Sequence, residues 1–189
     1  QLQSRWDTSQ LEFAIEIADL LLKHFEDQQN GGFYFTASDH EQLMHRPKTL
    51  ADESMPSGNG VAAFALQRLG HLIGEQRYID AAERALRSAW QAMDEYPHGH
   101  VTLLAALEEY LTPPEILVIR GPDADTWRDS AATLYAPNRM LVAIPETATE
   151  LPGLLADRKA SDGETLAYRC VGTHCELPVK TWEALAALL

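Results

Sequence analysis

The chain has 189 residues, of which 46% are hydrophobic and 23% are charged, a composition typical of a globular protein. It carries 15 Lys and Arg residues against 28 Asp and Glu residues, which gives a formal net charge of −13 at pH 7. This charge repels phosphate groups, so we expect neither nucleic acid nor an anionic membrane as a partner. Two cysteines are too few for a disulfide scaffold, and a reducing cytoplasm is the expected location.

The first predicted helix begins near Ser9, because Ser9 and Glu12 have the spacing of a capping box. The apolar residues that follow cover a broad face, which predicts a helix buried on more than one side. The helix is expected to end near residues 26–29, where Asn30 and two glycines stop it.

Three further helices are predicted before residue 113. Ser57 or Asn59 is expected to cap the second helix, and Gly74 separates it from a third, antiparallel one. Pro97 begins the fourth helix, and the proline pair at 113–114 ends it.

The pattern changes after residue 113. Residues 116–119 and 140–144 are short runs typical of strands, and residues 124–134 between them have a helical pattern. This order predicts a βαβ unit with parallel strands. Two more strands are predicted at 166–171 and 175–179.

A long segment without helical periodicity separates the first two predicted helices. Residues 31–60 read GGFYFTASDHEQLMHRPKTLADESMPSGNG. Loops of this length within compact domains are uncommon and are usually functional or disordered. The aromatic and aliphatic content of this loop argues against a plain disordered linker, so we expect a functional or bracing segment.

The same loop carries a recognisable motif. It resembles the GG-F-x-x-T-x-x-D…R-x-K…D…P-S-G-N pattern of the thioredoxin-domain-containing, spermatogenesis-associated protein 20-like family. A second match, Tyr168-Arg169-Cys170…Cys175…Pro178-Val179, lies near the end of the chain in the expected order. The positions that carry the first match are Gly31, Gly32, Phe33, Thr36, Asp39, Arg46, Lys48, Asp52, Pro56, Ser57, Gly58 and Asn59.

The resemblance implies a fold and a larger context. Family members look like a thioredoxin-like domain followed by an α/α toroid of the six-hairpin glycosidase type, and this chain matches only their C-terminal part. We therefore predict a mainly α fold, with αα-hairpins of a toroid in residues 1–112 and a small α/β element in residues 113–189. Because the chain begins at Gln1 and has too few helices to close a toroid, we expect the N-terminal remainder of a longer protein to be its partner.

The resemblance also implies a cleft at the 31–60 loop, which would suit a sugar or sugar-phosphate ligand. Asp39 and Asp52 are the candidate catalytic carboxylates, since glycoside hydrolysis uses two of them at a defined separation. Arg46 and Lys48 could clamp a carboxylate or phosphate. The helix start at Ser57, Gly58 and Asn59 offers free backbone N–H groups, which could bind an anion or a sugar hydroxyl group.

A structural interpretation of the same loop stays open. In it, Asp39, Arg46, Lys48 and Asp52 form a salt-bridged brace, and Ser57 and Asn59 are helix caps. Phe33 could stack on a sugar ring or belong to the core.

The two cysteines, Cys170 and Cys175, face each other across a predicted hairpin. This spacing permits a cross-strand disulfide, and His174 beside the second cysteine could lower a thiolate pKa in a redox pair. Two free thiols are the alternative. With a single adjacent histidine, the pair falls short of a zinc site, so neither a metal nor a cofactor is expected.

Two functions follow as hypotheses. The first is a carbohydrate-directed protein, which binds, hydrolyses or epimerises a sugar. The second is a non-catalytic scaffold or interaction module that accompanies a thioredoxin-like redox domain.

Overall fold

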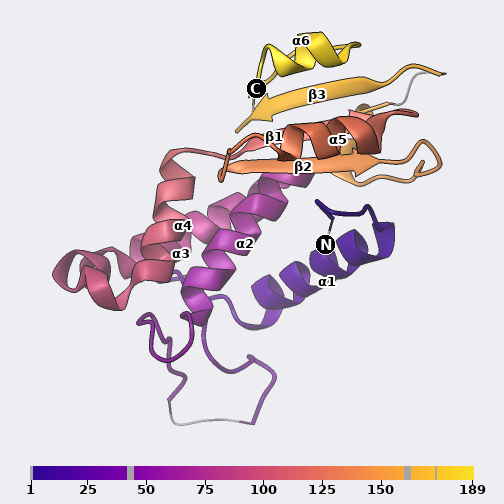
Figure 1. The fold of residues 1–189 in the computed structure, drawn as a ribbon. Helices are drawn as coiled ribbons and strands as arrows, with labels where there is room; N and C mark the ends of the chain where they lie inside the picture. Colours follow the sequence, from indigo (N-terminus) through magenta and orange to yellow (C-terminus); the bar gives the residue numbers. More distant parts are fainter. Residues whose placement is uncertain (1, 42–44, 160–162, 173) are drawn as a thin grey trace. The chain divides into compact units, whose positions relative to one another are not determined.

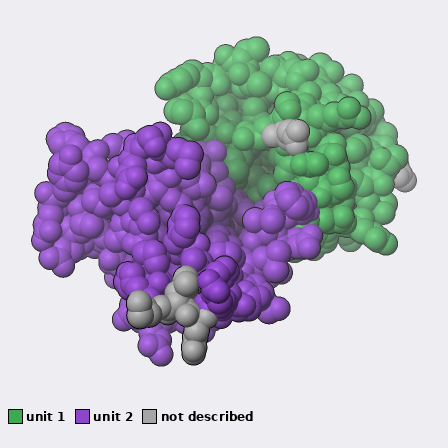
Figure 2. All heavy atoms as spheres, turned by 90° about the horizontal axis from the view of Figure 1, so that it is seen from below, with its two compact units in different colours: residues 1–12, 71–74, 113–189 green, residues 13–70, 75–112 purple. Residues whose placement is uncertain are grey.

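The computed structural model describes residues 2–41, 45–159, 163–172 and 174–189. These residues form two compact units (Figure 2). Unit 1 comprises residues 1–12, 71–74 and 113–189, and unit 2 comprises residues 13–70 and 75–112. The predicted division into two domains at residue 112 stays a prediction. None of the described helices is long and apolar enough to cross a membrane.

Unit 2 is built from helices. They are α1 (Thr8–His24) and α2 (Gly58–Ile73), each of which has one end in unit 1, then α3 (Gln76–Glu95), the 3-10 helix η1 (Pro97–Gly99) and α4 (Val101–Leu111) (Figure 1). Small residues let α3 pack closely, since Ala82, Ala85 and Ala89 are fully buried. A partly buried ion pair joins α2 to α4, with Arg68 Nη2 2.7 Å from Glu109 Oε2.

The start of α1 differs from the predicted capping box. The side chain of Asp7, not that of Ser9, accepts the hydrogen bond at the helix start, from Ser9 N at 3.0 Å. Hydrogen bonds from Ser9 lower the pKa of Asp7, although desolvation opposes the shift. The helix is also less buried than predicted, because Phe13, Ile17 and Leu20 are exposed.

Unit 1 contains a four-stranded sheet. Strands β1 (Glu115–Arg120) and β2 (Arg139–Ile144) are parallel and are connected through α5 (Ala124–Ala132), which confirms the predicted βαβ order. Strand β3 (Leu166–Val171) pairs antiparallel with β1, and β4 (His174–Cys175) pairs antiparallel with β3. The strand order is β2-β1-β3-β4.

The last strand is shorter than predicted. The sequence predicts a strand at 175–179, but β4 includes only Cys175 from this range. Val179 instead forms an isolated antiparallel bridge with Ala167. Pro178, which has no N–H group to donate, lies in the segment that leaves the ladder.

One face of the sheet packs against α5 and α6 (Trp182–Ala186), which lie along β1, β2 and β3 in Figure 1. Alternate strand residues point to this face, as the pleat requires. Trp127 and Trp182 meet edge to face at its border. The buried cluster is Leu117, Ile119, Ala124, Ala131, Leu141, Ala143, Ala167 and Leu185.

The predicted fold class is wrong. About 48% of the structure is helical, and the described chain combines six α-helices with a four-stranded mixed sheet, which is not an α/α toroid. A toroid requires repeated helical hairpins joined by short turns. Here the described residues between α1 and α2 form no helix, and the chain after α4 forms a sheet of its own with α5 and α6 as its cover.

Candidate functional site

The loop after α1 folds back on the end of that helix. Tyr34 N donates to Phe25 O at 2.8 Å, and Asp27 N donates to Gly32 O at 2.9 Å, so the two segments pair antiparallel. Gly31 makes the turn with φ of +77°, and a Cβ there would lie 2.3 Å from the carbonyl oxygen of Arg84. Both the backbone conformation and the close approach therefore require glycine at this position.

The turn is organised by the carboxylate of Asp27, which is buried with 6% exposure. Lys48 Nζ lies 2.7 Å and the Tyr34 hydroxyl 2.8 Å from its Oδ2. The backbone N–H groups of Gln29 and Asn30 donate to Oδ1 at 3.1 and 3.0 Å. Each contact comes from a different point of the turn and the loop, so Asp27 holds them together.

These contacts shift the ionisation of both acidic groups in the cluster. The hydrogen bond from Lys48, with those from Asn30 and Tyr34, holds the pKa of Asp27 far below its ordinary value despite desolvation. The hydrogen bond to Asp27 raises the pKa of Tyr34. Asp27 is therefore ionised and Tyr34 neutral at physiological pH.

The two cations of the loop, Lys48 and Arg46, bind other groups of the same chain. Lys48 Nζ also donates to Gly31 O at 2.9 Å. The guanidinium of Arg46 lies 4.1 Å from the centroid of the Tyr34 ring and donates from Nη2 to Thr36 O at 2.6 Å. Both cations thus close the loop around Tyr34, where a ligand clamp would need them directed outward.

The carboxylate of Asp52 is held by backbone amides. Ser57 N donates to its Oδ1 at 2.7 Å, and Thr102 N, in the first turn of α4, donates to its Oδ2 at 2.8 Å. Burial acts to raise the pKa of Asp52, but the hydrogen bonds from Thr102 and Ser57 outweigh it, and the pKa is lowered. Asp52 therefore ties the loop to the starts of two helices.

Asn59 and Ser57 are buried, and their side chains also bind backbone groups of the loop and of α2. Asn59 Oδ1 accepts from Phe33 N at 2.6 Å, and its Nδ2 donates to Phe33 O at 2.9 Å and to Thr49 O at 3.0 Å. The side-chain amide thus pairs with Phe33 as a neighbouring strand would. Ser57 Oγ caps α2 by accepting from Gly60 N at 3.0 Å.

The remaining predicted residues divide between surface and core. Asp39 is exposed and lies against a histidine, with Oδ2 3.4 Å from His24 Nδ1. Phe33 is buried, with 4% exposure, whereas Phe35 is 75% exposed. The structure therefore brings Arg46 and Lys48 together around Asp27 and Tyr34 and does not pair them with Asp39 or Asp52. The catalytic roles predicted for Asp39 and Asp52 stay predictions.

A hollow of about 500 Å³ opens beside the loop. Tyr34, Phe35 and Met55 give it an apolar wall, and Glu53 contributes a carboxylate. The start of α2 at Gly58 also lines it. Its size is within the range of small-ligand pockets, about 300 to 1,000 Å³.

The sequence prediction missed Asp27. The signal for it was the short spacing from Asp27 to Asn30 and Gly31, because an Asp side chain that accepts from the N–H groups two and three residues later is a common turn former. The helical pattern was instead extended over this residue. Among the described residues there is also no cluster of three or more His, Cys, Asp or Glu side chains that could hold a metal ion.

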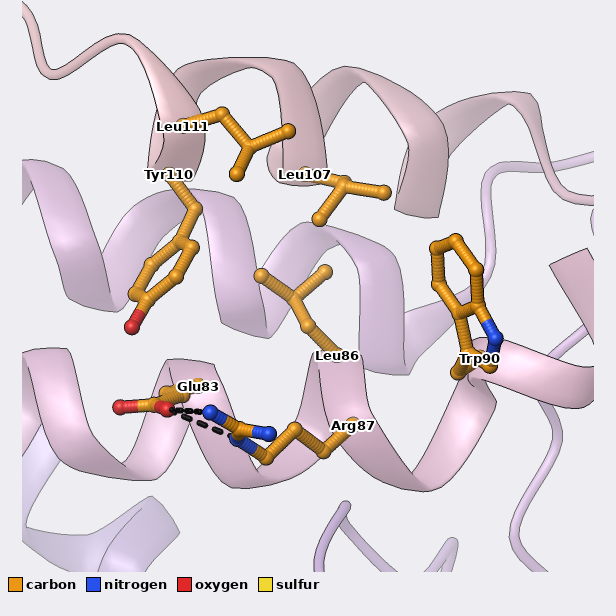
Figure 3. Close-up of a pocket in the computed structure, with 7 residues that line it drawn as sticks. All are labelled: Glu83, Leu86, Arg87, Trp90, Leu107, Tyr110 and Leu111. Atoms are coloured by element: carbon orange, nitrogen blue, oxygen red, sulfur yellow. Dashed lines mark hydrogen bonds and ion pairs between the residues drawn. The ribbon is translucent and has the colours of Figure 1, made fainter.

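A second hollow, of about 410 Å³, lies in unit 2 between α3 and α4 (Figure 3). Leu86 of α3 and Leu107 of α4 point toward each other across it, with Trp90 at one end. At the other end Glu83 receives hydrogen bonds from Arg87 and Tyr110, and both lower its pKa. Burial and the hydrogen bond to Glu83 raise the pKa of Tyr110. The groove is thus apolar along its length and polar at one end.

Cys170 of β3 and Cys175 of β4 face each other in the ladder and are joined by a disulfide bond. Cys170 is 7% exposed, and Cys175 is half-buried. Arg158 Nη2 lies 2.8 Å from Cys175 Sγ and 3.4 Å from Cys170 Sγ. The sequence prediction did not identify this arginine, since nothing in its spacing links it to the cysteines.

Comparison with curated proteins finds similar sequences. The chain is distantly similar to spermatogenesis-associated protein 20. It is 27% identical to the Homo sapiens protein over 187 residues, with 94% of this chain and 23% of that protein covered. The values for the Rattus norvegicus protein are 27% over 186 residues, with 92% of this chain and 23% of that protein covered. No family model matches the chain.

The similarity to the spermatogenesis-associated protein 20 sequences covers nearly all of this chain but about a quarter of each relative. It supports the relationship that the loop motif indicated. The predicted thioredoxin-like neighbour and the predicted sugar chemistry are not part of what the similarity establishes.

The first prediction concerns Asp27. We expect Asp27→Asn to lower the free energy of unfolding at pH 7 by about 2 kcal/mol, because the amide cannot replace the charged acceptor of Lys48 or all of the N–H acceptor positions. Urea unfolding followed by circular dichroism measures this. Asp39→Asn is the matched control, and we expect it to change stability by no more than about 0.5 kcal/mol because Asp39 is exposed.

The difference in stability between wild type and Asp27→Asn should depend on pH in a defined way. The pKa of Asp27 is depressed in the folded state, so its contribution is complete above the ordinary Asp value of about 3.9 and is lost as the pH falls through the folded pKa. The stability difference between wild type and Asp27→Asn should stay constant from pH 7 to about 5 and shrink below about 4. A difference that is equally small at every pH contradicts the role of Asp27.

Proposed function

We propose that this chain is a non-catalytic part of a longer protein and that unit 2 docks through its apolar surfaces onto the remainder of that protein. The observation that carries the proposal is the exposure of α1. Phe13, Ile17 and Leu20 are 58%, 48% and 41% exposed, although their spacing places them along one side of the helix. Contiguous exposed apolar surface of this kind marks an interaction site.

The groove between α3 and α4 is the second apolar surface of unit 2. Trp90 and Leu111, which line it, are 58% and 71% exposed. Its apolar length and its polar end at Glu83 match a helix that presents an apolar side with one polar residue at the corresponding end. An aromatic side chain beside a groove is also the kind of anchor that dominates binding energy at interfaces.

The occupant we propose is the remainder of a longer polypeptide. The relatives are about four times as long as the part that this chain matches, since the match covers 23% of each. Such a protein supplies further segments to cover the exposed surfaces at high effective concentration. The loop supports a non-catalytic role, because Asp27, Asp52 and Asn59 are fully engaged in bracing contacts.

The test uses this chain and the separately expressed remainder of the longer protein. We expect the two to bind in isothermal titration calorimetry, and we expect Trp90→Glu or Phe13→Glu to weaken binding by a factor of about 30, which corresponds to about 2 kcal/mol for a buried aromatic anchor. Both side chains are more than half exposed, so the variants should fold as wild type does.

Leu177→Glu is the matched control, because it places the same charge at an 89% exposed apolar residue of unit 1. We expect it to bind as wild type does. Failure of the wild-type chain to bind the remainder, or equal binding by all variants, contradicts the proposed docking.

A small sugar in the hollow beside the loop is the second candidate. The hollow of about 500 Å³, with the exposed Phe35 ring on its wall, favours it, since an aromatic face can stack on a sugar ring. In a thermal-shift screen with monosaccharides, disaccharides and sugar phosphates, at least one should raise the melting temperature. Phe35→Ala should abolish that rise, and Phe13→Ala should not. The absence of a shift with every sugar excludes this candidate.

A further inference from the structure

The hairpin of β3 and β4 places one disulfide beside one cation. Cys170 and Cys175 are bonded across the two strands, and Nη2 of Arg158 lies within 3.4 Å of both sulfurs. The arginine follows the 3-10 helix η2 (Gly153–Asp157). Arg120 Nη1 donates to the carbonyl oxygen of Arg158 at 2.9 Å, which fixes its backbone. The guanidinium also lies 5.4 Å from the centre of the Tyr168 ring.

The charge of Arg158 has no counterion among the described residues. No described carboxylate forms an ion pair with it, whereas the nearby Arg169 pairs with both Glu115 and Glu176. A disulfide is neutral and only a weak acceptor, so it makes little use of a cation. A thiolate next to an arginine is stabilised strongly, because the positive charge lowers the cysteine pKa.

We propose that Cys170 and Cys175 form a thiol–disulfide exchange site in which Arg158 holds Cys175 as the reactive thiolate when the bond is reduced. Cys175 has this role because it is closer to the guanidinium and more exposed. Cys170 is 7% exposed and is the resolving thiol. Arg158 is a positioning residue that acts through its charge.

The exchange is balanced with an external disulfide as the oxidant. The Cys175 thiolate attacks one sulfur of that disulfide, and the second external sulfur leaves as a thiolate. Cys170 then loses its proton and attacks Cys175 Sγ, which forms the internal disulfide and releases the first external sulfur as a thiolate. Two electrons pass to the external pair. In the reverse direction, one thiolate of an external dithiol attacks Cys175 Sγ and expels the Cys170 thiolate, whose sulfur is also 3.4 Å from Arg158. The second external thiolate then attacks the first external sulfur, which forms the external disulfide and releases Cys175 as a thiolate.

Other ionisable groups border the site, and their effects on the pKa of Cys175 must be distinguished from that of Arg158. His71 lines the same small hollow as the two cysteines, and His174 precedes Cys175 in β4. Glu176 follows Cys175, and its Oε1 is 2.6 Å from Arg169 Nη1. A His174→Gln variant tests the imidazole that lies next to the cysteine in sequence.

The experiment measures thiol reactivity on reduced single-cysteine chains. In Cys170→Ser, the rate of alkylation of Cys175 by iodoacetamide is followed against pH. We expect a pKa below the ordinary cysteine value of about 8.5. Adding Arg158→Gln should raise the pKa and slow alkylation at pH 7 about fivefold. Arg158→Lys should largely preserve the rate. His174→Gln should have a smaller effect than Arg158→Gln.

Arg128→Gln is the matched control, because it removes the same charge from an arginine that pairs with Asp125 and Asp129 on α5. It should leave the rate unchanged. A second comparison does not depend on the arginine variants, since Cys175→Ser should leave a Cys170 that reacts more slowly than Cys175 does. Faster reaction of Cys170, or an unchanged Cys175 pKa in a folded Arg158→Gln chain, overturns the proposal.

Discussion

The buried carboxylate of Asp27 determines how the loop after α1 is held. A buried charge is costly unless it is paired and hydrogen-bonded. Asp27 meets this requirement only if Lys48 and Tyr34 return from the loop to the end of the helix, at 2.7 and 2.8 Å from Oδ2. The turn at Gly31 makes that return possible, and the return places Phe33 where Asn59 pairs with its backbone. The positions of Phe33, Tyr34 and Lys48 in the loop therefore depend on the ionised carboxylate of Asp27.

This arrangement engages polar residues of the loop motif in contacts within the chain. Lys48 binds the carboxylate of Asp27, and Asp52 accepts from the backbone of α4, so both residues brace the loop. What unit 2 presents instead is apolar, namely one side of α1 and the groove around Trp90. In the described part of unit 1, Arg158 forms no ion pair and faces a disulfide instead.

The elements of the structure that depend on local pattern could be predicted from the sequence. The strands near 116–119 and 140–144 and their parallel pairing follow from short apolar runs on either side of a helical pattern. The partners of charged residues could not be predicted, because pairing depends on distances across the fold. Lys48 meets Asp27, which lies 21 positions earlier, and Asp52 meets backbone amides instead of a cation. The toroid was inferred from a resemblance, and local pattern could not correct it, since helical periodicity does not specify how helices close into a ring.

The most direct measurement is a double-mutant cycle between Asp27 and Lys48. The free energy of unfolding is measured by urea denaturation at pH 7 for wild type, Asp27→Asn, Lys48→Met and the double variant. If the buried pair organises the loop, the effects are non-additive, with a coupling energy of about 1 to 2 kcal/mol, as expected for directly interacting groups. Effects that add to within about 0.5 kcal/mol would show that the two residues act independently and would contradict the account.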